Sequence, residues 1–256
     1  MATLQQLKSA YLCHNQSDIE DAWSSRWGGT HHQWRKTIYP RVSRFLPTDS
    51  ILEIGCGRGM LSQHLMRYTR TLTLVDFIDT RQQQLLPAVA NDAQVNFYHN
   101  DGMTLNKIAD KSVDFAFSFF SLIDANNETI ESYIEDLNRV LTKNGVAFIH
   151  HSNALPEPGQ QLDANLFANM SRVRAADVNA QVVRKIANAF NFEARVQECV
   201  AWAPGTPLMD CFTTLTRPSN VVVKNIGQFD NLYFEDEVRY GISDLSTNYG
   251  SSQNTR

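Results

Sequence analysis

The segment ILEIGCGRG, residues 51–59, constrains the fold of this chain more than any other stretch. A short apolar run leads into three glycines spaced two residues apart, Gly55, Gly57 and Gly59. Glycine at the end of a strand permits a tight turn and lets a ligand approach the backbone closely. Ligands of open parallel sheets bind beyond the carboxyl ends of the strands. The segment therefore predicts either a ligand-binding turn or a plain strand-to-helix turn.

Strand-like and helix-like runs alternate from residue 50 onward. The first five strand-like runs are SILEIG, TLTLVD, AQVNFYH, KSVDFAFSFF and GVAFIHHS, and the clearest helical pattern lies near residues 128–141. This alternation predicts parallel strands joined by crossovers. Two later runs, ARVQECVAW and MDCFTTLT, extend the sheet. We expect a Rossmann-like, doubly wound α/β fold of seven mostly parallel strands with one antiparallel edge strand.

The chain divides into three expected parts. Residues 1–49 form an N-terminal helical cover or lid, residues 50–217 form the α/β domain, and residues 218–256 form a polar tail that is partly ordered.

Composition restricts the partners and the compartment. The chain has 256 residues, of which 43% are hydrophobic, and a net charge of −4. This mildly acidic balance argues against nucleic acid and anionic lipid as partners. No segment approaches the roughly 20 apolar residues of a membrane helix. The four cysteines are widely spaced and contain no CxxC pair, which favours a reducing compartment. We expect a cytoplasmic protein.

Two further features indicate which ligand the glycine turn binds. Asp76 ends the second strand-like run, 19 residues after Gly57, where a carboxylate can accept hydrogen bonds from ribose hydroxyls. The alternative for Asp76 is a helix cap. A dinucleotide motif would need glycine at position 60, which is Met60, and Glu53 stands just upstream of the turn. An acid at this place suits a cationic ligand, such as a sulfonium that carries an amino group.

These residues resemble the first motif of the class I S-adenosylmethionine-dependent methyltransferases, E/D-x-G-x-G-x-G, which Glu53, Gly55, Gly57 and Gly59 match in full. The resemblance covers about residues 50–150 and implies S-adenosylmethionine as the cofactor. It implies that residues 55–57 pass under the methionine part, that Asp76 holds the ribose and that Asp101 contacts the adenine amine. For Asp101 the alternative is a turn residue in Asn-Asp-Gly. The cofactor-binding residues implied are Glu53, Gly55, Cys56, Gly57, Asp76, Phe77, Asp101, Gly102, Ser118 and Phe119.

Two adjacent histidines, His150 and His151, end the fifth strand-like run, close to the expected position of a methyl acceptor. Neighbours in a strand point to opposite faces, so at most one should enter the cleft. We expect His151 to be that residue and His151→Ala to lower turnover. A neutral imidazole can remove the proton of an attacking hydroxyl as a general base. The alternative is a packed histidine that is hydrogen-bonded to a carbonyl.

Asp124 follows the fourth strand-like run. It is a candidate to orient the histidine, to bind an acceptor hydroxyl or to ligate a divalent cation. Its alternative is the cap of the helix near 128–141.

An aromatic and basic stretch near the start, RWGGTHHQWRKTIYPR, is a candidate lid. Trp27 and Tyr39 would stack on a sugar ring, and Arg41 would grip phosphate. A helical cover packed on the sheet is the alternative.

A narrower resemblance extends from about residue 26 to 217. WGGTHHQW, PRVSRFLP, SLID and FIHHSN are similar to segments of the sugar O-methyltransferases found with bacterial polysaccharide biosynthesis. The resemblance implies a saccharide acceptor, with Trp202 and Asp210 on the acceptor wall. Asp124 stands where that group has histidine, and Phe120 where an acid is expected, so the histidine pair carries the base role.

Several alternatives remain open. The alternative acceptors are a small metabolite and a phosphate oxygen. From other classes, the chain could be an NAD-dependent oxidoreductase or a non-catalytic cofactor-binding scaffold. The oligomeric state is not fixed, and a homo-oligomer is one option.

Overall fold

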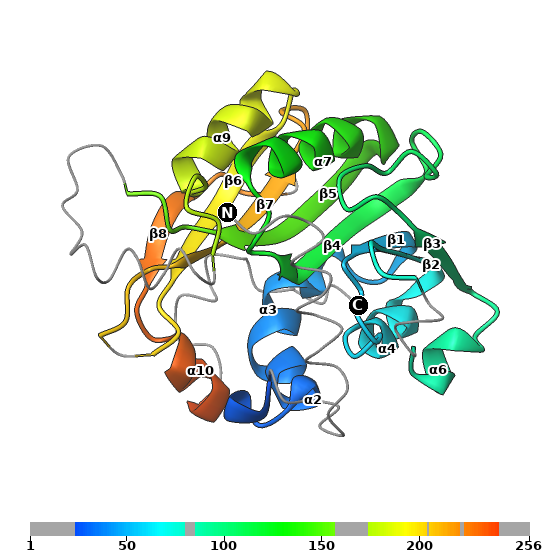
Figure 1. The fold of residues 1–256 in the computed structure, drawn as a ribbon, viewed down its shortest axis with the longest axis horizontal. Helices are drawn as coiled ribbons and strands as arrows, with labels where there is room; N and C mark the ends of the chain where they lie inside the picture. The colour runs from blue at the N-terminus through cyan, green and yellow to red at the C-terminus, as the bar shows by residue number, and fades with distance from the viewer. Residues whose placement is uncertain (1–23, 80–84, 157–173, 204, 221–222, 241–256) are drawn as a thin grey trace.

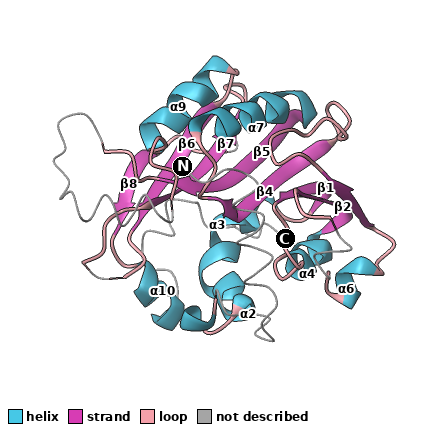
Figure 2. Ribbon diagram, viewed as in Figure 1, coloured by secondary structure: helices cyan, strands magenta, loops and turns pink. Residues whose placement is uncertain are grey.

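The computed structural model describes residues 24–79, 85–156, 174–203, 205–220 and 223–240. The described chain folds into one sheet covered by helices on both faces (Figure 1). Figure 2 shows the same layers coloured by type, with α7 and α9 on one face and α2, α3, α4, α6 and α10 on the other.

The strands are β1 (Thr48–Ile54), β2 (Thr69–Asp76), β3 (Val95–His99), β4 (Val113–Leu122), β5 (Leu141–Ser152), β6 (Glu193–Val200), β7 (Asp210–Thr216) and β8 (Gly227–Asn231). The helical segments are η1 (Ser25–Trp27), α2 (Thr30–Gln33), η2 (Trp34–Ile38), α3 (Tyr39–Val42), η3 (Ser43–Phe45), α4 (Ser62–Leu65), η4 (Met66–Tyr68), α6 (Pro87–Ala90), α7 (Asn127–Val140), α9 (Ala180–Ala189) and α10 (Phe234–Tyr240).

The strand order is β3-β2-β1-β4-β5-β7-β6-β8. Strands β1 to β5 pair in parallel, and the order reverses between β1 and β4. The carboxyl ends of these strands therefore meet at one edge of the sheet, and the reversal leaves a crevice beside β1, which is where such folds bind ligands.

The doubly wound, mostly parallel fold predicted from the sequence is confirmed, with two corrections. The sheet has eight strands, because residues 227–231 of the expected polar tail pair with β6 as β8. The antiparallel strand is internal and lies between β5 and β6, not at the edge. The α9 crossover carries the chain back so that β6 runs parallel to β5, and β7 then turns back into the gap between them.

Local sequence explains the two longest helices. Helix α7 buries one stripe of residues at helical spacing, and its N-cap is Asn126, whose side chain accepts a hydrogen bond from the Thr129 N–H at 3.0 Å. Helix α9 is capped in the same way by Asn179, whose side chain accepts a hydrogen bond from the Val182 N–H at 2.9 Å. Both helices pack on the same face of the sheet and share one apolar core.

The described part of the N-terminal region covers the opposite face. Trp34, Ile38 and Val42 are buried there against the phenylalanines of β4. Residues 1–23 of the expected lid lie outside the described residues. Among the helices that the structure describes, none has the length and apolar character to cross a membrane.

Candidate functional site

The glycine turn leaves β1 in a conformation that requires glycine. Gly55, Gly57 and Gly59 have φ values of +75°, +53° and +84°. A Cβ atom at Gly55 would lie 2.2 Å from the Cβ of Ser121, at the end of β4. The hydroxyls of Ser118 and Ser121 both donate to the carbonyl of Ile54, at 3.0 and 2.8 Å. The ends of β1 and β4 are thus fastened together with no room for a side chain at Gly55.

Glu53 lies beneath this turn with 3% of its surface exposed. Its carboxylate accepts a hydrogen bond of 2.5 Å from the Ser62 hydroxyl. Burial, together with the charge of Asp76, raises the pKa of Glu53 to about 8. Because no cation of the described chain pairs with this carboxyl group, a bound cation would find a buried acid beside it.

Asp76 ends β2 and is bound to the glycine turn. Its two carboxylate oxygens accept the N–H groups of Gly57, at 3.0 Å, and Ile78, at 2.9 Å. A carboxylate has about four acceptor sites, so a group that accepts these two N–H groups has the capacity to accept from ribose hydroxyls as well. Cys56 is buried in the turn, and Phe77 follows Asp76 as a half-buried side chain.

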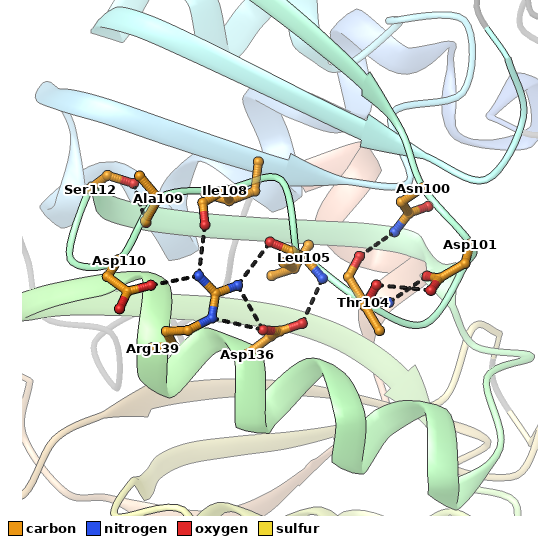
Figure 3. Close-up of polar contacts among 10 residues, drawn as sticks. All are labelled: Asn100, Asp101, Thr104, Leu105, Ile108, Ala109, Asp110, Ser112, Asp136 and Arg139. Carbon is orange, nitrogen blue, oxygen red and sulfur yellow. Dashed lines mark hydrogen bonds and ion pairs between the residues drawn. The ribbon is translucent and has the colours of Figure 1, made fainter.

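Asp101 lies in the loop after β3, which Figure 3 shows in detail. Its carboxylate is exposed and accepts the N–H groups of Met103 and Thr104 and the Thr104 hydroxyl. These hydrogen bonds outweigh the effect of burial and lower the pKa of Asp101. Gly102, with a φ of +80°, completes the turn. Asp101 thus has the turn role, and its exposed position leaves the predicted adenine contact open to it.

Arg139 of α7 holds the rest of this loop in place. Its guanidinium donates to the carbonyls of Ile108 and Leu105, at 2.7 and 2.9 Å, and pairs with Asp110 and Asp136 (Figure 3). The loop is therefore tied to the helix over most of its length.

The end of β4 connects the glycine turn to the histidines. Ser118 is fully buried, and Phe119 packs on the ring of His150 at 4.9 Å. Phe120 has a φ of +61°, which is rare for a residue with a side chain. Its N–H donates to Nδ1 of His150 at 3.1 Å. Ser121, the next residue, is the one that touches Gly55.

His150 forms a dyad with Asp210. The His150 ring is fully buried, and its Nε2 lies 3.4 Å from Oδ2 of Asp210, the first residue of β7, within ion-pair distance but without a hydrogen bond among the described residues. Arg174 donates to both oxygens of Asp210, and the indole N–H of Trp202 donates to one of them. Burial would raise the pKa of Asp210, but His150 and Arg174 outweigh it and hold this pKa below its usual range. Burial lowers the pKa of His150, so the imidazole is neutral near pH 7.

His151 points to the opposite face and is fully bonded. Its Nδ1 lies 2.8 Å from the Ser152 carbonyl, and its Nε2 lies 2.7 Å from the Thr213 hydroxyl. Burial lowers the pKa of His151 to about 4. These contacts are those of the packed histidine named as the alternative, so we carry His150 forward as the base candidate.

Asp124 is exposed at the carboxyl end of β4. It does not cap α7, because Asn126 does. The loss of water around it and the charge of Asp210 raise the pKa of Asp124, while Arg174 opposes this. A search of the described residues finds no cluster of three or more His, Cys, Asp or Glu side chains that would hold a metal ion.

The predicted lid residues take up other positions. Arg41 is buried, and all of its N–H groups are directed at Glu198, Glu237 and the Thr37 carbonyl. The prediction that this guanidinium binds phosphate is therefore wrong, because its N–H groups already donate to carboxylates of β6 and α10. Tyr39 stacks on Tyr68, away from the dyad. Trp27 packs on Trp202, with ring centroids 5.0 Å apart, and Trp202 lies 5.7 Å from the His150 ring.

Three residues of the site escaped the sequence analysis. Phe120 and Ser121 act through backbone geometry and close packing, and neither property has a sequence signal in a single chain. Arg174 follows a segment outside the described residues, and no local pattern links it to Asp210.

Comparison with known proteins identifies the chemistry. Residues 52–149 match the family model described as "Methyltransferase domain". The match contains the glycine turn, Asp76, the Asp101 loop and the end of β4. Residues 52–149 are therefore a methyltransferase domain. The tight cradle at Gly55, the buried acid at Glu53 and the carboxylate at Asp76 fit that cofactor, and the NAD-dependent alternative is set aside.

Solved structures support the fold of this methyltransferase. A Listeria monocytogenes protein assigned as an S-adenosylmethionine dependent methyltransferase is 11% identical, with a TM-score of 0.54, over 74% of this chain and 99% of that one. The methyltransferase bound to the Trm112 activator in Haloferax volcanii is 15% identical, with a TM-score of 0.53, over 77% and 95%. The PH0226 protein of Pyrococcus horikoshii OT3 is 17% identical, with a TM-score of 0.52, over 71% and 88%. The chain spans 52% of the CalO1 methyltransferase of calicheamicin biosynthesis, at 14% identity and a TM-score of 0.49. None of the curated proteins matches the chain in sequence.

Proposed function

We propose that this methyltransferase transfers the methyl group to a hydroxyl of a saccharide, and that His150 removes the hydroxyl proton. The observation that carries the proposal is the direct connection from the cofactor turn to the dyad: Gly55 touches Ser121, and the neighbouring Phe120 binds His150. A base on this connection stands at the same edge of the sheet as the methyl donor.

The dyad sets the protonation of His150. Asp210 lies near Nε2 and favours a proton on that nitrogen, which leaves a lone pair on Nδ1. That lone pair now faces the Phe120 N–H at 3.1 Å. Phe120 is in a left-handed conformation that costs of the order of 1 kcal/mol, so its peptide is readily displaced. In the proposal, the acceptor hydroxyl takes the place of this N–H on Nδ1.

These groups account for the bond that forms, the bond that breaks and the proton that is released in the transfer. S-adenosylmethionine supplies a methyl group on a positively charged sulfur. A bond forms between the acceptor oxygen and the methyl carbon while the carbon–sulfur bond breaks, and the hydroxyl proton passes to Nδ1 of His150. The Asp210 carboxylate then stabilises the imidazolium, as an acid partner does for a catalytic histidine.

The side chains around the dyad favour a sugar as the acceptor. Trp202 lies 5.7 Å from the His150 ring and packs on Trp27, and Asp124 offers an exposed carboxylate that can accept from sugar hydroxyls. Asp124 is proposed to bind the acceptor; a role as ligand to a divalent cation is tested by adding a chelator to the same assay.

The cytoplasm remains the proposed compartment. The described cysteines, Cys56, Cys199 and Cys211, are free and buried, which suits a reducing environment.

Mass spectrometry of acceptor products tests the proposal. The enzyme is incubated with S-adenosylmethionine carrying a labelled methyl group and with three acceptor pools: oligosaccharides, nucleotide sugars and small phenols. We expect label on a saccharide oxygen, and loss of at least about 100-fold in turnover for His150→Gln, the lower range for removal of a general base. His151→Phe is the matched control and should retain turnover. Label only on phenols or on phosphate oxygens would contradict the saccharide assignment, and full turnover in His150→Gln would remove the base.

A further inference from the structure

A second cavity lies between the N-terminal cover and the segment that follows the glycine turn. It has a volume of about 330 Å³, which falls within the range of small-molecule sites. Segments α2, η2 and α3 form one side, and α4 and η4 form the other. Its lining is aromatic and basic: Trp34, Tyr39 and Tyr68, with Arg35, Arg67 and the histidines His31 and His64.

This cavity is separate from the cofactor turn. Arg67 and Tyr68 immediately precede β2, whereas Asp76 ends that strand. Eight residues of strand span roughly 23 Å, with a rise of about 3.3 Å per residue. The cavity therefore opens toward the edge of the sheet opposite to the cofactor.

The charge in the cavity is one-sided. Two guanidiniums and two imidazoles line it, and no carboxylate does. Within the described part of the chain, neither Arg35 nor Arg67 is paired with an acid. Basic groups gathered without counter-ions favour a bound anion.

His64 supplies an independent observation. Its side chain is 96% buried, and its Nε2 atom has no hydrogen-bond partner among the described residues. The ring is held flat against Trp34, with centroids 5.4 Å apart and planes 8° from parallel. A buried polar nitrogen normally has a partner, because leaving it without one costs free energy. His64 is among the residues that line the cavity, so a ligand bound there is a candidate partner for this nitrogen.

The walls define the rest of the ligand. Tyr39 and Tyr68 stack on each other at 5.4 Å, and Trp34 lies 5.8 Å from Tyr39. These aromatic side chains provide an apolar wall for a ring, while the guanidiniums can donate to an oxyanion in bidentate fashion. We propose that this cavity binds a ring-bearing small molecule that carries an oxyanion, with Arg35 and Arg67 on the anion and His64 Nε2 donating to it.

Burial and the neighbouring charges of His31 and Arg67 lower the pKa of His64 to about 4. The imidazole is therefore neutral near pH 7 and takes part as a hydrogen-bond donor, while the arginines supply the charge.

Isothermal titration calorimetry on the full chain tests the site with phenyl phosphate, benzoate and phenol. We expect phenyl phosphate or benzoate to bind at least about tenfold more tightly than phenol, a difference of 1.4 kcal/mol. The stronger of the two anions shows whether the natural ligand is a phosphate or a carboxylate. Equal binding of phenol would overturn the proposal.

Variants localise the anion. Arg35→Gln combined with Arg67→Gln should lower the affinity for the anion at least about tenfold. His64→Phe, which keeps the stacked ring, should weaken it several-fold. Arg70→Gln is the control, because Arg70 pairs with Asp49 at the surface outside the cavity. Binding of S-adenosylhomocysteine at the glycine turn should be unchanged in all variants, which separates this site from methyl transfer. Unaltered anion affinity in the Arg35 and Arg67 double variant would overturn the proposal.

Discussion

At the scale of single residues, Gly55 is the most constrained position. Its φ of +75° and the 2.2 Å approach to Ser121 both exclude a side chain. We predict that Gly55→Ala destabilises the fold by about 1–3 kcal/mol, as expected for a strained backbone, and weakens S-adenosylhomocysteine binding at least about tenfold. Urea denaturation and calorimetry measure the two effects. Gly205→Ala, where φ is +76° but nothing lies within 4 Å of the added Cβ, is the control for the φ effect alone. Equal effects in both variants would contradict the packing argument.

Glu53 predicts a pH dependence of stability. Its pKa rises from 4.5 to about 8 in the folded chain, so the folded state keeps a proton that the unfolded state has lost. The stabilisation from this group is full below pH 4.5 and is lost as the pH rises toward 8. We expect the ligand-free protein to lose stability over that interval, and Glu53→Gln to flatten the loss. Chemical denaturation between pH 5 and pH 8 checks this; a Glu53→Gln profile as steep as that of the wild type would contradict it.

The residues of the cofactor turn could be predicted from the sequence because each belongs to a local pattern in the chain. Glycine is required at positive φ, and Asp76 stands at the end of a strand-like run, 19 residues after Gly57. Arg41 was misread because its partners, Glu198 and Glu237, lie far away in sequence. The local sequence shows a basic residue, but it does not show which carboxylates pair with that residue in the fold.

At the scale of elements, Arg41 joins α3 to β6 and α10. Its guanidinium pairs with Glu198 and Glu237, and Asn231 of β8 donates to both carboxylates. We predict that Arg41→Met lowers the free energy of unfolding by about 3–5 kcal/mol, because two buried carboxylates lose their cation. Urea denaturation measures it. Arg70→Met, which breaks only an exposed pair, should change it by less than about 1 kcal/mol. Similar values for the two variants would contradict a structural role of the buried cluster.

Arg139 predicts how the β3–β4 loop affects the cofactor. Removing its bonds to Leu105, Ile108 and Asp110 should loosen the loop that carries Asp101. We expect Arg139→Met to weaken S-adenosylhomocysteine binding several-fold while the fold persists. Lys143→Met, at an exposed position, is the control. Calorimetry decides; unchanged affinity in Arg139→Met would show that the loop does not need this anchor.

Elements were predictable where the pattern is periodic or continuously apolar. The helix expected near 128–141 appears as Asn127–Val140, and β1, β2, β4 and β5 follow their apolar runs. β8 was missed because GQFDN is short and mostly polar, and it becomes a strand only through pairing with β6. The place of β7 was missed for a similar reason, since pairing across the sheet is not a local property.

At the scale of the whole molecule, one edge of the sheet brings the site together. The turn after β1, the acid after β2, the loop after β3 and the histidine of β5 all stand at carboxyl ends of parallel strands. The topology thus places a cofactor crevice and a base candidate side by side, while helices on both faces bury the sheet that holds them (Figure 1). The N-terminal cover and α4 also enclose the second cavity, which is proposed to bind an anion.

Calorimetric titration with S-adenosylhomocysteine and NAD tests the central claim, that the glycine turn binds the methyl donor. We predict that one S-adenosylhomocysteine binds per chain, that Asp76→Ala weakens it at least about tenfold, and that NAD produces no binding heat. Binding of NAD with no response to S-adenosylhomocysteine, or full affinity for S-adenosylhomocysteine in Asp76→Ala, would contradict the account.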